Sequence, residues 1–230
     1  MRGLGTLINT LTVLAGGGVG LLVGSRIPER LRTTVVQVIG IATLVMGIDS
    51  VLDTHNLVFP LVGTVIGAII GEVIGIEERL EAVGERLKQR FARDDDGGTF
   101  VKGFVTATLL FCVGPLTILG AIEDATGGTP RLYIIKGTLD GFMSVIFTAT
   151  YGIGAAFSAL SVLVVQGVLT LGGAGLDALL DDRMRTEMFA SGGFMVLAIG
   201  INLLGIAKIR LGSLLPGLLV TPILVAVFAV

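Results

Sequence analysis

The sequence predicts an all-α membrane protein, a polytopic bundle of about eight transmembrane helices. Hydrophobic residues make up 53% of the chain, charged residues make up 15%, and the mean hydropathy is +0.93. A soluble domain carries about 25% charged residues, so much of this surface must face lipid. The apolar residues also form uncharged blocks of about 20 residues, the length at which a helix crosses a hydrocarbon core of about 30 Å.

These blocks predict helices over residues 4–25, 33–52, 57–76, 101–122, 138–156, 160–178, 187–207 and 211–229. The uncharged run from Gly141 to Leu176 is nearly long enough for two crossings. We interpret it as a hairpin with a tight turn near Gly154–Ser158, which gives eight spans, whereas one long kinked helix would give seven. The blocks do not alternate as the strands of an outer-membrane barrel do. The 35 glycines favour close helix packing in lipid.

Lysine and arginine are distributed unevenly between the loops. The first loop, residues 26–32, and the third, residues 77–102, are rich in basic residues, whereas the second, around His55, has none. Cytoplasmic loops are enriched in Lys and Arg, so the first and third loops are predicted inside and the N-terminus outside. The protein is therefore expected to be a multi-pass protein of the bacterial cytoplasmic (inner) membrane.

Residues 77–98 are predicted to form a cytoplasmic amphipathic connector. Apolar residues recur there at spacings of three and four, which indicates a helix lying on or just under the membrane face. We interpret this helix as a solvated connector that packs on the bundle and ends at the DDDGG stretch, Asp94–Gly98. Its apolar face comprises Ile76, Leu80, Val83, Leu87 and Phe91.

A repeated motif divides the single membrane domain, residues 1–230. RTTVVQVIGIATLVMGID at 32–49 matches RTEMFASGGFMVLAIGIN at 185–202, and the offset is constant (185 − 32 = 153 and 202 − 49 = 153). The repeats are predicted over about 4–76 and 160–230, with a central helix pair over about 99–156. That pair would make the second repeat enter the membrane from the opposite side. Inverted repeats of this kind build many secondary transporters, with the binding site near the midplane.

Polar residues within the blocks are candidates for a transport or ion path. Asp49 and Glu72 are intramembrane acids, although each lies near the end of its block and could reach interfacial water. The amides Asn9 and Gln166 precede matching glycine-rich stretches and are predicted to face each other. Asn202 replaces Asp49 in the second repeat. For any single amide, a helix–helix hydrogen bond of about 0.6 kcal/mol is the simpler interpretation.

The segment LLFCVGPLTILGAIED, residues 109–124, contains a predicted break. Gly114 and Pro115 lie in mid-span, and a proline removes a backbone donor. Membrane helices tolerate such breaks where partners, water or ions satisfy the freed carbonyl groups. Four charged residues follow as candidates for an outer mouth: Glu123, Asp124, Lys136 and Asp140. Lys136 and Asp140 are more simply interpreted as an exposed, weak salt bridge at the start of the next helix.

The motifs GTLINTLTVLAGGGVG, LLFCVGPLTILGAIED with KGTLDG, and GGFMVLAIGINLLGI with LLPGLL identify a resemblance. The chain resembles the YdfK/YqgA-like family of bacterial integral membrane proteins, a domain-of-unknown-function family, from Gly3 to about Pro216. The resemblance implies a multi-pass cytoplasmic-membrane protein, with a loose expectation of transport. It implies no established activity and no site residues.

Three classes of function follow from these observations. A secondary transporter or channel for a small solute or ion is favoured, and a structural or assembly protein without transport is the alternative. An enzyme is not expected, because no nucleophile–base pair, phosphate loop or metal cluster is apparent. The lone Cys112 gives no disulfide or CxxC pair, and we expect no metal and no cofactor. The expected partners are the lipid bilayer, a small solute or ion and a second copy of the chain, but no nucleic acid.

Overall fold

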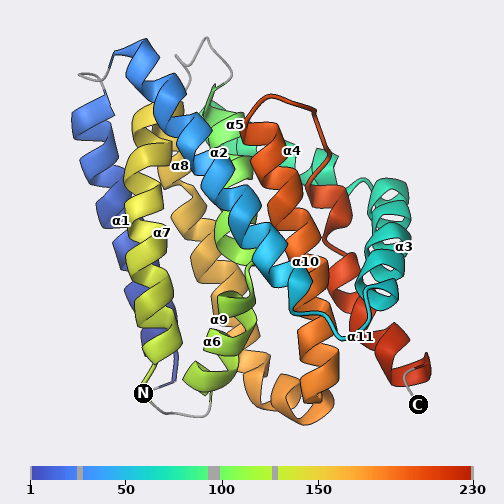
Figure 1. Ribbon diagram of the computed structural model, residues 1–230. Coiled ribbons are helices and arrows are strands. Elements are labelled where there is room, and N and C mark those ends of the chain that lie inside the picture. Colours follow the sequence, from blue (N-terminus) through green and yellow to red (C-terminus); the bar gives the residue numbers. More distant parts are fainter. Residues whose placement is uncertain (1, 25–27, 93–98, 126–128, 229–230) are drawn as a thin grey trace. The chain divides into compact units, whose positions relative to one another are not determined.

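The computed structural model describes residues 2–24, 28–92, 99–125 and 129–228, and it contains helices but no strand within these ranges (Figure 1). The elements in chain order are α1 (Leu4–Gly24), α2 (Glu29–Leu52), α3 (Val58–Ile74), α4 (Ile76–Phe91), α5 (Thr99–Val113), α6 (Pro115–Ala125), α7 (Arg131–Tyr151), α8 (Ile153–Ala156), α9 (Ser158–Leu179), α10 (Asp182–Leu203), the 3-10 helix η1 (Gly212–Leu214) and α11 (Gly217–Phe228).

The helices confirm the predicted all-α membrane class. Among the described residues, five helices are long and apolar enough to cross a membrane. The number rises to seven if two bent pairs each count as one span: α3 with α4, bent by 55°, and α5 with α6, bent by 60°. Residues 212–228 form a shorter apolar helix. The count of eight spans and the inverted repeat stay predictions.

The long uncharged run turns back on itself as a hairpin, as predicted. The chain turns between Tyr151 and Ser158, where Gly152 has a φ of 76°, a left-handed conformation that glycine adopts without strain. The turn separates α7 from α9. Because α7 runs parallel to α1 and α9 runs antiparallel to it, the two halves of the run have opposite directions (Figure 1).

Several helix starts differ from the sequence prediction: α2 begins at Glu29 rather than residue 33, and α11 begins at Gly217 rather than residue 211. Two further differences have a clear cause. Helix α7 begins at Arg131 rather than residue 138, because the polar residues that suggested a loop pair with one another inside the bundle. Helix α10 begins at Asp182 rather than residue 187, because the Asp181 side chain accepts a hydrogen bond from the Met184 N–H at 2.7 Å and caps the helix.

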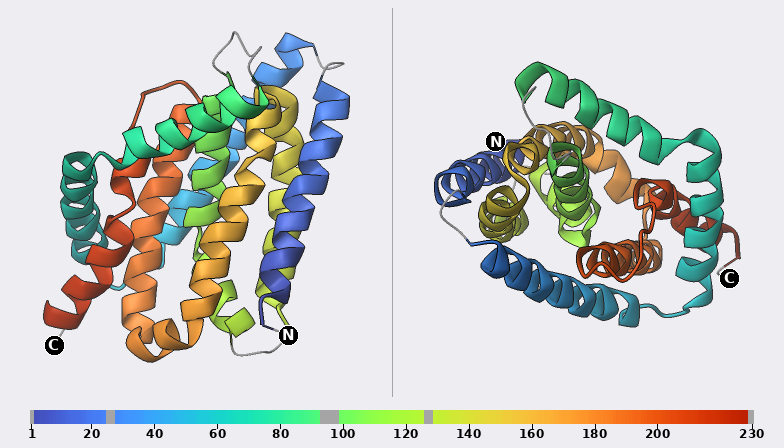
Figure 2. Two further views of the ribbon diagram at one scale, coloured as in Figure 1. Left: turned by 180° about the vertical axis from the view of Figure 1, so that it is seen from behind. Right: turned by 90° about the horizontal axis from the view of Figure 1, so that it is seen from above.

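The chain forms two compact units. Unit 1 comprises Met1–Val36, Glu81–Cys112 and Leu116–Asp177. Its centre is the pair α1 and α7, which lie side by side (Figure 2). A Cβ at Gly16 would lie 2.2 Å from the Gly141 carbonyl oxygen, and one at Gly20 would lie 2.4 Å from that of Val145. These glycines therefore allow the two backbones to approach closely, as small residues do between membrane helices.

Unit 2 comprises Gln37–Leu80, Val113–Pro115 and Ala178–Val230. Helix α3 packs antiparallel on α11, and a glycine on each turn makes the contact (Figure 2). Thus Gly63 meets Thr221, Gly67 meets Gly217, and Gly71 meets Ser213.

Helix α2 also packs antiparallel on α10 in unit 2, and both helices belong to the repeated motif. A Cβ at Gly193 would lie 2.9 Å from the Gly47 carbonyl oxygen, and a Cβ at Gly47 would lie 3.0 Å from that of Gly193. A Cβ at Gly200 would lie 3.0 Å from the Gly40 carbonyl oxygen. The glycines shared by the two motifs are thus the points where these helices touch.

The predicted amphipathic connector is α4. It follows α3 through Gly75, whose φ of 72° gives the chain its left-handed turn at the end of α3. Glutamates begin the helix, basic residues end it, and Gly84 is buried against Phe104. The DDDGG stretch that is predicted to end this helix lies outside the described residues.

Candidate functional site

A buried ion pair occupies the interior of unit 1. Lys136 and Asp140 lie one turn apart on α7 and form a salt bridge, with 4% and 8% of their surface exposed. The sequence predicts this pair, but as an exposed pair at a helix end. That expectation of exposure is wrong, because α7 begins earlier than predicted and carries both residues into the bundle. Removing one partner of a buried pair strands the other charge, at a cost of about 3–5 kcal/mol.

Helix α1 contributes an amide to the pair. The Asn9 side chain is fully buried, and its Nδ2 donates a hydrogen bond of 3.0 Å to the Asp140 carboxylate. Its Oδ1 has no hydrogen-bond partner in the described part of the chain. The orientation of the amide is fixed, because only its nitrogen can donate to a carboxylate. Asn9 therefore brings an unsatisfied acceptor to the vicinity of the ion pair.

The break between α5 and α6 supplies a backbone carbonyl group. Lys136 Nζ donates a hydrogen bond of 2.6 Å to the carbonyl oxygen of Phe111. In a continuous helix this oxygen would accept from the N–H of residue 115. Pro115 has no N–H, so the carbonyl oxygen is left for Lys136 and for the Thr117 hydroxyl, which donates at 3.3 Å. The predicted helix break thus frees the carbonyl group that Lys136 binds.

The electrostatic field at the end of α5 favours a positive charge beside the Phe111 carbonyl oxygen. The Phe111 carbonyl belongs to the last turn of α5, where the helix dipole places partial negative charge. The Tyr133 hydroxyl donates 2.8 Å to the Thr117 carbonyl and fastens α6 to α7.

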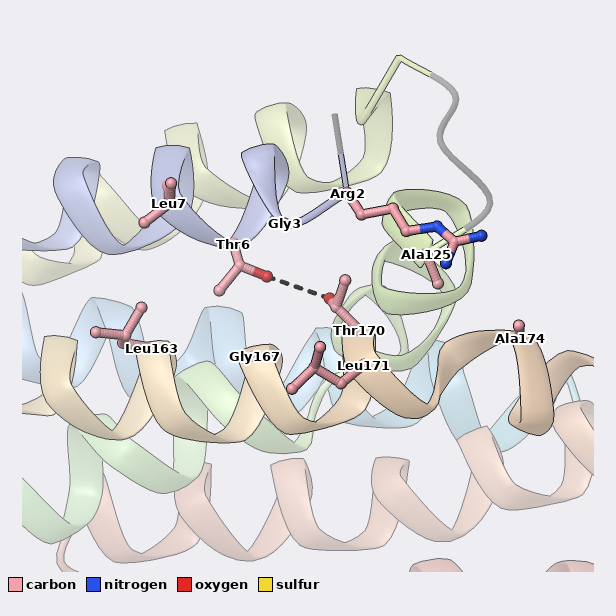
Figure 3. Close-up of a pocket in the computed structure, with 10 residues that line it drawn as sticks. All are labelled: Arg2, Gly3, Thr6, Leu7, Ala125, Leu163, Gly167, Thr170, Leu171 and Ala174. Carbon is pink, nitrogen blue, oxygen red and sulfur yellow. Dashed lines mark hydrogen bonds between the residues drawn. The ribbon is translucent and has the colours of Figure 1, made fainter.

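Gln166 approaches the same region from α9. It is fully buried, and neither polar atom of its amide has a partner among the described residues. It lies one turn from Thr170, whose hydroxyl contacts that of Thr6 at 3.2 Å (Figure 3). Asn9 follows Thr6 by one turn of α1. Asn9 and Gln166 therefore lie on neighbouring helices at a similar level. No hydrogen bond joins them.

A pocket of about 320 Å³ opens between α1 and α9 beside this contact (Figure 3). The residues that line it include Arg2, Thr6, Gly167 and Thr170.

Two predicted mouth residues hold helix ends. Asp124 is fully buried and accepts from the backbone N–H groups of Gly5 at 3.1 Å and Thr6 at 3.2 Å, which stabilises the start of α1. Glu123 accepts from the Leu132 N–H at 2.8 Å at the start of α7. These contacts give both acids a structural role.

The other predicted path residues belong to unit 2. Asp49 is exposed near the end of α2. Glu72 is exposed and pairs with Arg210, and it accepts from the Ser213 hydroxyl at 2.9 Å. Asn202 bonds the backbone of Ile209 through both of its amide atoms, at 2.8 Å each, and so holds the loop after α10. Within unit 1 the structure brings Asn9, Lys136 and Asp140 together with the Phe111 carbonyl group, whereas Asp49, Glu72 and Asn202 belong to unit 2.

Sequence reasoning missed a buried acid in unit 2. Glu187 is fully buried on α10 and accepts from the backbone N–H groups of His55 at 3.0 Å and Asn56 at 3.1 Å. It therefore orders the loop between α2 and α3. Its position at the start of a predicted apolar block was a visible signal. Within the described residues, no group of three His, Cys, Asp or Glu side chains could hold a metal ion.

Comparison with known proteins places the chain in a family. The profile of DUF554, a family described as of unknown function, matches residues 4–226. The chain is 30% identical to "Uncharacterized membrane protein YdfK" of Bacillus subtilis (strain 168) over 226 residues, 97% of this chain and 96% of that protein. It is 31% identical to "Uncharacterized protein YqgA" of Escherichia coli (strain K12) over 219 residues, 94% and 93% of the two chains. No solved structure matches it significantly. The predicted resemblance is confirmed: this multi-pass membrane protein belongs to the DUF554 family.

Proposed function

We propose that the protein is a secondary transporter or channel for a small solute or ion in the bacterial cytoplasmic membrane. The observation that carries this proposal is the Lys136–Asp140 pair, buried against the Phe111 carbonyl at a broken helix. Charged side chains inside membrane segments are expensive and usually mark a path for substrates or ions. In many transporters the site lies where discontinuous helices expose backbone carbonyl groups, and unit 1 has this arrangement.

The packing of α2 on α10 supports an inverted repeat. Residues 40 and 47 of the first motif correspond to 193 and 200 of the second. Gly40 meets Gly200, and Gly47 meets Gly193, so each contact is the counterpart of the other. Reciprocal contacts between equivalent positions are the mark of a two-fold axis. Since the helices are antiparallel, that axis would lie across them, as in inverted-repeat transporters.

The second candidate function is that of a structural or assembly membrane protein without transport. The observation that favours it is the glycine packing of α1 on α7 and of α3 on α11, which suits a rigid bundle. In that case the ion pair would only fix the register of α7. The expectation that the protein is not an enzyme also stays a prediction.

Flux measurements in proteoliposomes distinguish the two candidates. Wild type is compared with Lys136→Gln/Asp140→Asn, which keeps the side-chain sizes and removes both charges together. A matched control, Lys208→Gln/Asp53→Asn, makes the same changes at exposed positions. Gradients of alkali chlorides, amino acids and small carboxylates are tested in turn. We expect flux with wild type and with the control, and no flux with the site variant. If no gradient moves through folded wild type, or if the site variant matches it, the transport proposal is wrong.

A further inference from the structure

A groove runs between α1 and α9 in unit 1, and neither Lys136 nor Asp140 lines it. Its first part is the pocket of about 320 Å³ beside the contact of Thr6 with Thr170 (Figure 3). A second pocket of about 430 Å³ continues the groove beyond Leu163, which lines both pockets. The lining residues recur at every third or fourth position, so each helix presents one face to the groove. They include Leu7, Leu14 and Leu21 of α1 and Leu160, Leu163 and Leu171 of α9.

Glycines leave this groove unfilled. A Cβ at Gly167, which lines the first pocket, would have no atom within 4 Å, and the same holds for Gly18 in the second pocket. These two glycines differ from Gly16 and Gly20, whose missing side chains allow α1 to pack closely on α7. The walls of an unfilled apolar groove lack van der Waals contacts on one side. An apolar occupant would therefore be stabilised there.

The groove lies within the part of the protein that faces hydrocarbon. Both of its walls belong to candidate membrane spans, Leu4–Gly24 and Ile153–Leu179. The hydroxyl groups of Thr6 and Thr170 contact each other at 3.2 Å, so they require no polar partner from an occupant. Leu171, which lines the first pocket, is 90% exposed. An occupant of the groove is therefore apolar and reaches it from the bilayer.

The first pocket has the length of one leaflet. On α9 its lining begins at Leu163 and ends at Ala174, eleven residues later (174 − 163 = 11). At 1.5 Å per residue, this is about 16 Å of helix. The hydrocarbon core of a bilayer is about 30 Å thick, so the acyl chains of one leaflet cover about 15 Å. One acyl chain of a phospholipid therefore matches the length of this pocket.

A positive charge lies at one end of the first pocket. Arg2 lines the pocket just before the start of α1, and it is exposed (Figure 3). Arginine side chains near the ends of membrane helices place their charge at the level of the lipid headgroups. A guanidinium group binds phosphate through two parallel hydrogen bonds. The charge and the groove are thus arranged like the headgroup and the acyl chain of an anionic phospholipid.

We propose that this groove binds one anionic phospholipid, with an acyl chain between α1 and α9 and the headgroup phosphate on Arg2. The bound lipid completes the packing of these two helices where Gly167 leaves it open. The inference goes beyond the proposed transport function and does not depend on it. A second copy of the chain is the other candidate occupant, and the experiment below distinguishes the two.

The test uses fluorescence quenching by brominated lipids. The chain contains no tryptophan, so a single introduced tryptophan reports on one place. Leu171→Trp is the reporter in the groove. Val168→Trp is the matched control, because Val168 lies on the same helix, is 63% exposed and lines neither pocket. Each variant is reconstituted in phosphatidylcholine vesicles with an increasing fraction of phosphatidylglycerol that is brominated in the upper half of one acyl chain. Brominated phosphatidylcholine is tested in parallel.

The expected result is a preference for the anionic lipid at the groove alone. One basic residue near an anionic headgroup strengthens binding about fivefold. We therefore expect half-maximal quenching of the groove reporter at a roughly fivefold lower fraction of phosphatidylglycerol than of phosphatidylcholine. The control reporter should need equal fractions of the two lipids. Equal fractions at both reporters would overturn the proposal. A groove reporter that neither lipid quenches would also overturn it, because a second copy of the chain would then cover the groove.

Further changes in the Leu171→Trp variant test the two parts of the site. Arg2→Gln should abolish the preference for phosphatidylglycerol, whereas Lys208→Gln, at an exposed position of unit 2, should keep it. Gly167→Leu fills the groove and should raise the half-quenching fraction of phosphatidylglycerol to that of the control reporter. Gly172→Leu should leave that fraction unchanged, because a Cβ there also has no atom within 4 Å but Gly172 lines neither pocket. A preference that survives Arg2→Gln or Gly167→Leu would overturn the assignment.

Discussion

The ammonium group of Lys136 and the carbonyl oxygen of Phe111 are joined by a hydrogen bond of 2.6 Å, and Pro115 makes that bond available. A helix interior normally keeps its carbonyl groups occupied, so a lysine has little to bind there. The proline removes one donor, and the side chain of Lys136, 25 positions after Phe111, takes its place. A local sequence signal, Gly114-Pro115, thereby explains a long-range polar contact.

Restoring the missing donor is expected to weaken the site. Pro115→Ala supplies an N–H at position 115, which can bond the Phe111 carbonyl and compete with Lys136. Loss of one hydrogen bond to a charged group is worth about 1.5–3 kcal/mol, so binding or flux should fall roughly ten- to hundredfold. Solute flux in proteoliposomes measures the effect. Pro222→Ala in α11, a proline inside a unit 2 helix, is the control and should leave flux unchanged.

The two charges are expected to stabilise the fold only as a pair. Asp140→Asn leaves the buried Lys136 without its counter-ion and should lower the free energy of unfolding by about 3–5 kcal/mol. Lys136→Gln/Asp140→Asn should recover much of that loss, since no unpaired charge remains. Thermal unfolding in detergent compares the variants, with Asp53→Asn as an exposed control. If Asp140→Asn is as stable as wild type, the Lys136–Asp140 pair is not buried in unit 1.

The close approach of α1 and α7 is expected to tolerate no side chain at Gly16. A Cβ there would lie 2.2 Å from the Gly141 carbonyl oxygen, so Gly16→Ala must push the backbones apart and should destabilise unit 1 by about 1–3 kcal/mol. Gly18 lies on the same helix with no atom within 4 Å of a Cβ. Gly18→Ala is therefore a matched control and should be neutral or slightly stabilising. The two unfolding temperatures in detergent test the contrast; equal values would contradict the packing.

The ion pairs of Arg210 in unit 2 are expected to weaken in acid. Arg210 bridges Glu72 and Glu78 between the α3–α4 junction and the segment before η1. A hydrogen bond from the backbone, and then one from Arg210, holds the pKa of Glu78 below its ordinary value of 4.5. A lowered pKa in the folded state means that the stabilisation is present above pH 4.5 and is lost as the pH falls through the folded-state pKa.

The Arg210→Gln variant tests these ion pairs. The pKa of Glu78 should rise towards its ordinary value but not reach it, because the backbone hydrogen bond remains. Carboxylate titration by NMR in detergent measures the change. Both side chains are solvent-exposed, so we expect only a small effect on global stability. An unchanged pKa would mean that Arg210 does not bind Glu78 in solution.

Much of the fold follows from the sequence, because block length and proline position act locally. The apolar blocks predict the membrane helices, and Gly114-Pro115 predicts the break between α5 and α6. Whether a side chain is exposed or buried, in contrast, depends on residues that are far apart in the sequence. From the sequence alone, Lys136 and Asp140 are expected to be exposed at the end of a helix. Their burial becomes apparent only from their partners on α1 and α5. The same holds for Asn202, whose path role rested on the repeat, but whose amide bonds the Ile209 backbone.

The most direct test of a transport role is solute flux into sealed liposomes that contain the purified protein. Gradients of alkali chlorides, amino acids and small carboxylates are imposed in turn, and uptake is compared among wild type, Asp140→Asn and protein-free liposomes. We expect wild type to carry at least one of these solutes and Asp140→Asn to carry none of them. Wild-type uptake that equals that of protein-free liposomes for every solute, or equal uptake with Asp140→Asn, would contradict the proposal that the buried Lys136–Asp140 pair is part of a transport site.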